Sequence, residues 1–158
     1  MTRTIRPLPA HEAAQLLPLL AEVHNIHVAA QPSRYVKDPD PREILPWLKD
    51  WLSGDHLYCL ASGPSGDLTA YLIYEVQRHE TSPLTPPRNR AMLHHISVAP
   101  THRRTGLGRA LITAMRDDLR TQGVAQIAVT YSSFNTASAA LMRSEGLLPV
   151  IEMAEGPV

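Results

Sequence analysis

The chain has 158 residues, enough for one domain with a sizeable core and too few for two ordinary ones, so we predict a single domain over residues 1–158. The formal net charge is zero, which argues against nucleic acid or an anionic membrane as the main partner. A single cysteine excludes an intramolecular disulfide, and no stretch resembles a membrane span or a secretion signal, so we expect a cytoplasmic protein.

The chain is predicted to begin with a strand and a helix. Residues 2–6 are expected to form a short strand that ends at Pro7. Residues 11–24 carry apolar side chains at helical spacing, and Pro18 is expected to kink that helix.

A loop and a second helix follow. Residues 31–41 contain three prolines and are predicted to form the loop. The helix is predicted through residues 47–52, with Trp47, Leu48 and Trp51 on one face, as core or as a pocket wall.

Two strands are predicted next, at residues 57–61 and 68–76, joined by a turn-rich loop. Residues 77–90 are polar and contain three prolines, which excludes an interior strand or helix. We therefore predict an exposed loop over residues 77–90.

The stretch from Leu93 to Met115 predicts a buried strand, a loop with two glycines and an amphipathic helix that begins near Gly106. Three basic side chains crowd the start of this helix and oppose its dipole: Arg103, Arg104 and Arg109. No Asp or Glu occurs from residue 81 to residue 116, so no carboxylate nearby in sequence neutralises them. These features predict an anion bound at the free backbone amides of the helix, which Gly106 and Gly108 make approachable.

Two common phosphate-binding motifs do not fit. The Gly-Lys-Ser/Thr ending of a Walker loop is absent, and a dinucleotide fingerprint would need a small residue where Leu111 stands and an acidic residue after the next strand. The hexad R-x-x-G-x-G, from Arg103 to Gly108, instead resembles the acetyl-CoA loop of the GNAT N-acetyltransferase superfamily.

A second motif downstream supports this resemblance. Residues 124–131 predict a buried strand parallel to the one at 93–98, and residues 135–147 predict a helix with Asn135 as its N-cap. The positions that match the family pattern are Asn135, Ser138, Leu141 and Gly146. Met142 stands where the family usually has Tyr, and Leu147 where it usually has Phe. The tail, residues 151–158, predicts one closing strand with a frayed end.

The resemblance implies an α/β fold with a mixed, mostly antiparallel sheet, a splayed parallel strand pair at its centre and flanking helices. It implies acetyl-CoA as cosubstrate, with backbone groups of the strand pairing with the pantetheine arm. No metal is expected. The implied cofactor-binding residues are Ile96, Val98, Arg103, Arg104, Thr105, Gly106, Leu107, Gly108, Arg109 and Asn135.

The implied activity is transfer of an acetyl group to a primary amine by direct attack. The expected acceptor is a small amine or a peptide N-terminus, and the loop over residues 77–90 is a candidate for contact with it. The acceptor's identity, the length of the acyl group and the oligomeric state, including a homodimer, stay open.

The reaction needs a base, because an alkylamine with a pKa of about 10.4 is protonated at neutral pH. His94 and His95 lie on the strand that leads to the cofactor loop. Strict alternation would place His94 on the face of Ile96 and Val98, and His95 on the opposite face with Leu93 and Ser97. In the resemblance to arylalkylamine acetyltransferases, His94 holds the position of a histidine of the proton path, so we predict His94 as the base.

The sequence indicates a general acid less clearly than it indicates a general base. In the family, the tyrosine that Met142 replaces commonly protonates the departing CoA thiolate. Tyr131, at the end of the neighbouring predicted strand, is the candidate substitute.

Two other functions stay open. A catalytically silent GNAT-like module could bind acyl-CoA as a sensor or scaffold, and Met142 favours that alternative. A phosphate-binding regulatory domain unrelated to CoA would explain the arginines, but it would leave the second motif unexplained.

Overall fold

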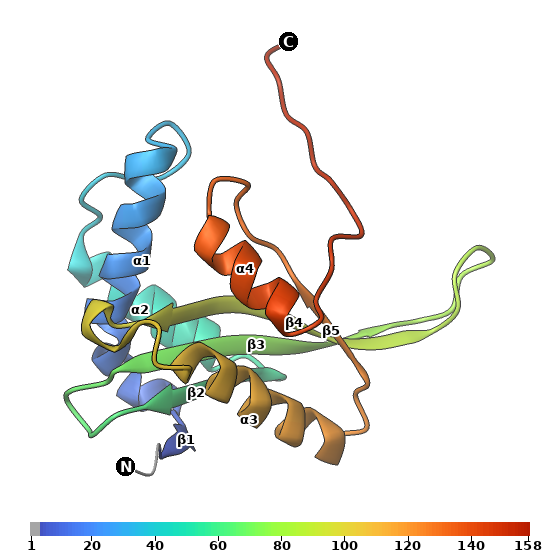
Figure 1. Ribbon diagram of the computed structural model, residues 1–158, viewed down its shortest axis with the longest axis horizontal. Helices are drawn as coiled ribbons and strands as arrows, with labels where there is room; N and C mark the ends of the chain where they lie inside the picture. Colours follow the sequence, from blue (N-terminus) through green and yellow to red (C-terminus); the bar gives the residue numbers. More distant parts are fainter. Residues whose placement is uncertain (1–3) are drawn as a thin grey trace.

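The computed structural model describes residues 4–158 and shows one sheet with helices on both faces (Figure 1). The strands, in sheet order, are β1 (Ile5–Pro7), β2 (Leu57–Ser62), β3 (Ala70–His79), β4 (Arg88–Val98) and β5 (Gln126–Val129). The pairs from β1 to β4 are antiparallel, and β4 pairs with β5 in parallel. The predicted α/β fold with a mixed, mostly antiparallel sheet is confirmed. Residues 2 and 3 of the predicted first strand lie outside the described residues.

Two apolar clusters hold the helices on the sheet. The 3-10 helix η1 (Ala10–Leu16), α1 (Leu17–Ala30) and α2 (Pro41–Leu52) pack on the face that carries Tyr71 and Ile73 of β3. α3 (Leu107–Thr121) and α4 (Thr136–Ser144) pack on the face that carries Leu72 and Tyr74. Alternate residues of β3 therefore pack into two different apolar clusters, one on each face of the sheet.

The N-terminal helices differ from the prediction in detail. Pro18 does not kink a continuous helix: it lies in the first turn of α1, where proline is tolerated, and the chain before it is 3-10 helical. α2 begins earlier than predicted, because the Asp40 carboxylate accepts a hydrogen bond from the Arg42 N–H at 2.9 Å and caps it. Of its predicted apolar face, Leu48 is 1% exposed, whereas Trp47 is 54% exposed.

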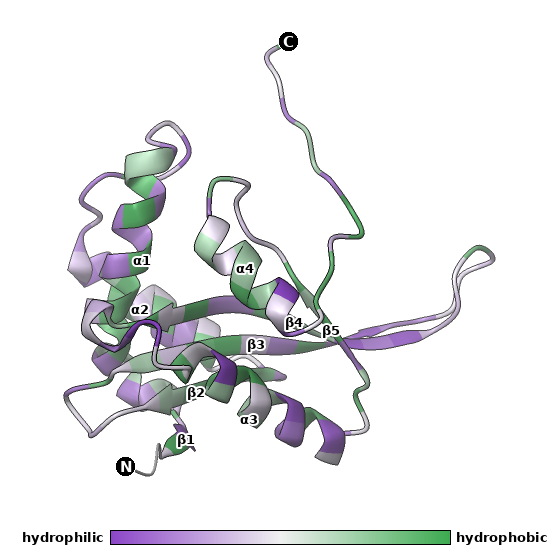
Figure 2. Cartoon of the chain, in the orientation of Figure 1, coloured by the Kyte–Doolittle hydropathy of each residue, from purple (hydrophilic) through white to green (hydrophobic). Residues whose placement is uncertain are grey.

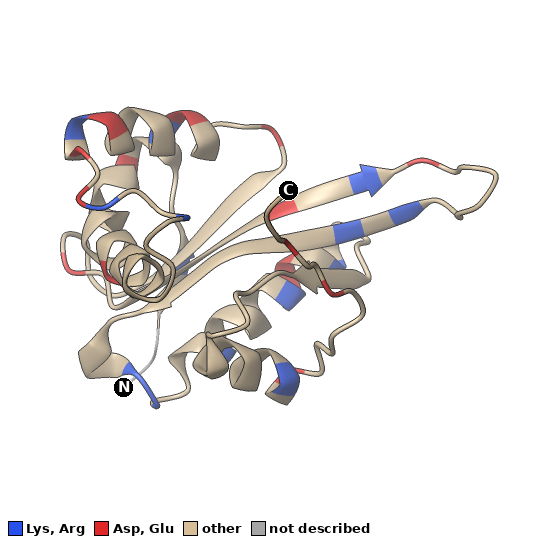
Figure 3. Cartoon of the chain, turned by 90° about the horizontal axis from the view of Figure 1, so that it is seen from above, with Lys and Arg blue, Asp and Glu red and all other residues tan. Residues whose placement is uncertain are grey.

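The prediction of a loop over residues 77–90 is wrong at both ends. Gln77 to His79 belong to β3 and Arg88 to Arg90 belong to β4, so the two strands extend as a paired ribbon beyond the rest of the sheet. The ribbon is hydrophilic in Figure 2, and its basic positions are blue in Figure 3. Polar strands are possible here because, apart from the pairing of Arg90 with Gln126 of β5, each pairs only with the other. The three prolines all fall in the tip at residues 80–87.

The C-terminal part matches the prediction up to the tail. The helix at residues 107–121, the strand at 126–129 and the helix at 136–144 form as expected, although the strand is shorter than its apolar run. The predicted closing strand at 151–158 does not form. Pro149, which lacks an N–H, precedes it, and the segment runs clear of the sheet (Figure 1). Within residues 4–158, no helix is long and apolar enough to cross a membrane.

Candidate active site

The site begins where β4 and β5 part. Their parallel pairing ends at the pair Leu93 and Val129. β5 stops there, but β4 continues to Val98 with β3 on one side only. Among the described residues, the segment from His94 to Val98 therefore has an edge without a neighbouring strand. This is the splayed pair that the sequence predicted.

The loop after β4 is exposed. Two short-range hydrogen bonds and two residues in the left-handed region define its shape. The Arg103 side chain donates through Nε to the Val98 carbonyl at 3.2 Å, and the Thr105 hydroxyl donates to the His102 carbonyl at 2.6 Å. Arg104 has a φ of 63° and Gly106 a φ of 81°, both in the left-handed region. Glycine adopts that region at little cost, whereas at Arg104 it is unusual and marks a constrained turn.

The loop places the N-terminus of α3 beside the end of β4, where one edge of that strand has no neighbouring strand among the described residues. Gly106 is the N-cap, no side chain caps this end and no acidic residue lies in the first turn. The first amides of a helix have no acceptor within the helix, and its dipole is positive there. Leu107 is 5% exposed and packs into the core, so it can offer a ligand only its backbone.

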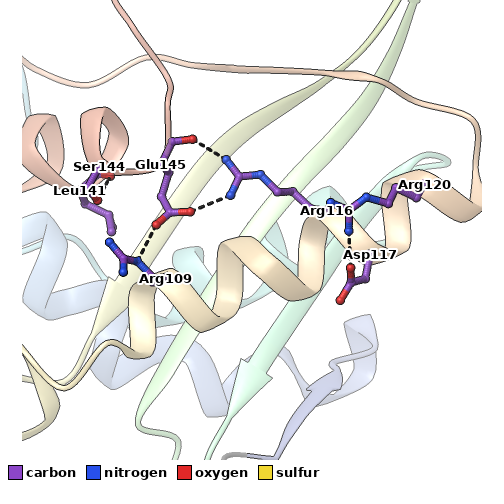
Figure 4. Close-up of polar contacts among 7 residues, drawn as sticks. All are labelled: Arg109, Arg116, Asp117, Arg120, Leu141, Ser144 and Glu145. Carbon is purple, nitrogen blue, oxygen red and sulfur yellow. Dashed lines mark hydrogen bonds and ion pairs between the residues drawn. The ribbon is translucent and has the colours of Figure 1, made fainter.

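The third predicted anion ligand, Arg109, is partly engaged by the protein (Figure 4). Its Nε donates to the Glu145 carboxylate at 2.8 Å, and Arg116 donates to the same carboxylate at 2.6 Å and to the Glu145 carbonyl at 2.5 Å. The Glu145 side chain is 6% exposed, while that of Arg109 is 64% exposed. As expected, no carboxylate nearby in sequence neutralises Arg109, but in space α4 brings Glu145 to it.

Gly108 has a packing role that the sequence did not reveal. A Cβ at this position would lie 3.1 Å from the Leu141 Cδ2 and 3.8 Å from the Ile96 Cδ1. Glycine therefore allows α4 to pack closely against α3 and β4. Of Gly106 and Gly108, only Gly106 has a positive φ, the backbone conformation that favours glycine.

A β-bulge in β4 corrects the predicted face of His94, whereas His95 lies opposite Ile96 and Val98 as predicted. Ile73 of β3 pairs with His95, but the next residue, Tyr74, pairs with Leu93, so His94 is the extra residue. Both imidazoles lie against the Trp51 ring of α2, with ring centroids 5.5 Å away in each case. Ile96 and Val98 pack on the opposite face with α3. The bulge breaks the alternation on which the prediction depended.

His94 forms a hydrogen bond that spans β3 and β4. Its Nε2 lies 2.9 Å from the Glu75 carboxylate, and both side chains are about one-third exposed, at 29% and 33%. The hydrogen bond to His94, and a second one from the Gln77 amide, lower the pKa of Glu75. A carboxylate that stays ionised can only accept, so Nε2 carries the hydrogen of this contact.

His95 has a different environment. Its Nδ1 lies 3.5 Å from the hydroxyl of Tyr71, a fully buried side chain. Burial, followed by the proximity of His94 and His27, lowers the pKa of His95 to about 4. This imidazole is therefore neutral at pH 7.

Two pairs of aromatic rings lie in this region, one in α2 beside the two histidines and one that joins α1 to the β5–α4 connection. Trp47 and Trp51 of α2 are stacked, with centroids 5.5 Å apart. His27 of α1 contacts Phe134, in the β5–α4 connection, at 5.4 Å. The open end of the sheet is therefore bordered by α1, α2 and the start of α4.

The remaining predicted residues lie in the β5–α4 region. Tyr131 follows the end of β5, is half-buried and packs on the α3 side of the sheet. Asn135 caps α4 by accepting from the Ser138 N–H at 3.0 Å, as predicted, so its oxygen is used within the protein. Met142 is fully buried in the core, away from solvent.

Sequence reasoning missed Glu75 and Glu145. Glu75 could have been found from the hairpin register, because it pairs with Met92 and is then diagonal to His94. Glu145 gave no local signal, since its partners lie on another helix.

Comparisons with known proteins agree with this geometry. The model of the acetyltransferase (GNAT) family matches residues 20–146. A tetramutant of the BH1408 protein from Bacillus halodurans has a TM-score of 0.86 at 18% identity, over 98% of this chain and 99% of that one. AAC(6')-Iy, in complex with a CoA-containing bisubstrate analog, has a TM-score of 0.74 at 19% identity, over 100% and 99%.

A third structure, the ribosomal-protein-alanine N-acetyltransferase from Brucella melitensis biovar Abortus 2308, has a TM-score of 0.67 at 18% identity, over 99% and 98%. At such low sequence identities, the likeness to these three structures shows a shared fold and nothing further. None of the curated proteins compared with the chain matches it.

Proposed function

We propose that this chain, which belongs to the acetyltransferase (GNAT) family, transfers an acetyl group from acetyl-CoA to the nitrogen of a primary amine. The observation that carries the proposal is the free edge of β4 next to the uncapped, basic start of α3. An extended polar chain with an anionic end fits these two features together.

The hydrogen-bond donors and cationic side chains at the end of β4 and the start of α3 suit acetyl-CoA. Backbone groups of Ile96 and Val98 would pair with the pantetheine amides, and the backbone from Thr105 to Gly108 would hold the pyrophosphate at the helix start. The cations at this end are Arg103, Arg104 and the exposed part of Arg109. The amide nitrogen of Asn135 is a further donor, since only its oxygen is used in the cap. Bound acetyl-CoA supplies the thioester carbonyl that the amine attacks.

His94 acts as the general base in this proposal. Its Nδ1 takes the proton from the ammonium of the acceptor, while Glu75 holds the ring through Nε2 and stabilises the imidazolium that forms. Glu75 contacts His94 and Gln77 and acts on the reaction only through the imidazole, so it is a positioning residue. Trp51, in contact with the imidazole, restricts the ring from the other side.

Tyr131 is the proposed source of the proton for the departing thiolate. A thiol titrates near pH 8.5, so the thiolate leaves readily and water can also supply this proton. Met142 takes no part, because its side chain is enclosed in the core.

The test is to incubate the purified protein with acetyl-CoA and a panel of amines while following thiol release. Structurally similar proteins are named as aminoglycoside acetyltransferases and as a ribosomal-protein-alanine N-acetyltransferase, so both classes of acceptor belong in the panel beside arylalkylamines and peptides. We expect turnover with at least one primary amine. CoA binding without turnover across the panel would instead support the silent acyl-CoA-binding module, which the buried Met142 favours.

A further inference from the structure

Two tryptophan rings of α2 lie beside the proposed base. Trp51 contacts the imidazoles of His94 and His95, with ring centroids 5.5 Å away in each case. Trp47 stacks on Trp51 at the same centroid distance. The two tryptophans are one helical turn apart, so both project from the same side of α2. We call Trp47 and Trp51 the indole pair.

The exposed indole of Trp47 stands out among the apolar side chains of the structure. It is 54% exposed, although tryptophan gains more from burial than almost any other residue. Within residues 4–158, every other large apolar side chain that is more than half exposed lies in a loop or in the C-terminal segment, whereas Trp47 lies in a regular helix. Its stack on Trp51 holds the ring, so the indole offers a preformed flat surface to a ligand.

The charges near the indole pair suit an acceptor with a single positive charge. Among the described residues, Glu75 is the only carboxylate that forms a hydrogen bond or ion pair with the indole pair, His94 or His95. Glu75 is already engaged by His94 and by the Gln77 amide. An acceptor with several ammonium groups, such as an aminoglycoside, would need further carboxylates to replace its hydration.

We propose that the acceptor amine carries an aromatic ring, which stacks on the indole pair while the amine reaches His94, and that Trp47 determines this specificity. The proposal rests on the acetyl transfer proposed above and names the class of amine: one ammonium group joined to a flat ring by a short aliphatic link. Aromatic rings attract one another beyond the area they bury, at centroid distances of about 4.5–7 Å. The stack of Trp47 on Trp51 already has this geometry.

Calorimetric titration tests the recognition of the ring without the need for turnover. The protein, with CoA present, is titrated with 2-phenylethylamine, with kanamycin and with 2-cyclohexylethylamine, a matched amine of equal charge and link length. We expect 2-phenylethylamine to bind about threefold or more tighter than the saturated ring, and tighter than kanamycin. Equal affinities for the two rings, or tighter binding of kanamycin, would overturn the proposal.

The same ring and amine also occur at a peptide N-terminus that begins with phenylalanine. The dipeptide Phe-Gly therefore joins the titration. Ring-dependent binding of either compound supports the proposal, and the tighter binder identifies a free amine or a peptide as the source.

Substitution of Trp47 supplies the second test. Trp47→Ala should weaken binding of 2-phenylethylamine at least about tenfold and reduce the preference for the aromatic over the saturated ring, whereas Trp47→Phe should retain that preference. The control is Lys49→Ala, at an exposed position on another side of α2, which should keep the wild-type affinities. A wild-type preference in Trp47→Ala would exclude Trp47 as the specificity residue.

Thiol release from acetyl-CoA with the same amines separates this proposal from the proposed function. Turnover of amines without any preference for an aromatic ring would refute the aromatic acceptor and leave acetyl transfer in place. Ring-dependent binding that Trp47→Ala weakens, with no turnover of any amine, would support the ring site and refute acetyl transfer.

Discussion

His94 and His95 are neighbours in the chain and face the same helix, yet their surroundings give them different chemistry. His94 is paired with a carboxylate at the border of solvent, whereas His95 contacts a buried tyrosine. A proton-accepting group needs a partner for the charge it acquires, and only His94 has one.

The first prediction concerns this pair. His94→Ala should lower kcat by about a hundredfold or more, because it removes the base. Glu75→Gln should lower kcat less, by about tenfold, and it should leave the KM for acetyl-CoA unchanged, since Glu75 orients the imidazole and lies away from the proposed cofactor loop. Steady-state kinetics of both variants provide the measurement, and His79→Ala, at the end of β3, is the control. Full activity of His94→Ala at neutral pH would remove His94 from the mechanism.

The second prediction concerns the buried imidazole. Because burial lowers the pKa of His95 to about 4, the folded protein binds this proton less readily than the unfolded chain, where the pKa is about 6.5. The contribution to stability is complete above about pH 6.5 and falls as the pH drops towards 4. The loss approaches on the order of 3 kcal/mol, at about 1.4 kcal/mol per pKa unit.

Urea denaturation at a series of pH values measures this loss. His95→Gln should flatten the decline in unfolding free energy between pH 6.5 and 4, whereas His79→Gln, at an exposed position, should keep the wild-type slope. Equal slopes in all three proteins would show that His95 does not cause the acid sensitivity.

At the scale of elements, the site depends on how closely α4 approaches α3 and β4. Gly108 and Leu141 meet at this junction, and Glu145 links the two helices through Arg109 and Arg116. The start of α3, where we place the pyrophosphate, is therefore positioned by a packed contact as well as by the loop.

The third prediction follows from that contact. Gly108→Ala places a methyl group 3.1 Å from the Leu141 side chain, so we expect a loss of about 1–2 kcal/mol in unfolding free energy. Leu141→Ala makes room, and in its background the added methyl group should cost less. A double-mutant cycle from denaturation curves measures the coupling. Additive effects of the two substitutions would mean that α4 does not constrain residue 108.

At the scale of the whole molecule, the fourth prediction links cofactor and stability. A ligand that binds only the folded chain, at about 100 times its dissociation constant, stabilises it by about 2.7 kcal/mol. For a chain of this size, acetyl-CoA should raise Tm by about 5–10 °C. Arg104→Ala should weaken CoA binding at least tenfold and reduce this shift, with little change in Tm without ligand, because Arg104 is exposed. An undiminished shift in the variant would take Arg104 out of the binding site.

The paired ribbon of β3 and β4 also belongs to the scale of the whole molecule. The tip of the ribbon lies at the far end of β4 from Val98, and His94 is six residues, or about 20 Å, from Arg88. Within one chain the ribbon tip is therefore remote from His94, and contact of this segment with the acceptor stays a prediction.

The sequence by itself determined the elements and motifs whose signals are local. The hexad from Arg103 to Gly108, the apolar stripe of α3 and the N-cap at Asn135 each depend on a few consecutive residues, so pattern and capping rules located them. The splay of β4 from β5 followed from the family resemblance that these motifs carry.

Only the tertiary structure decided what depends on register and on contacts between distant elements. A bulge of one residue turned His94 towards α2, hairpin pairing brought Glu75 to it, and helix packing brought Glu145 to the arginines. The apolar tail satisfied a strand pattern but pairs with no strand among residues 4–158. The physical reason is the same in each case: a pattern states which side chains a segment offers, whereas pairing depends on residues far away in the sequence.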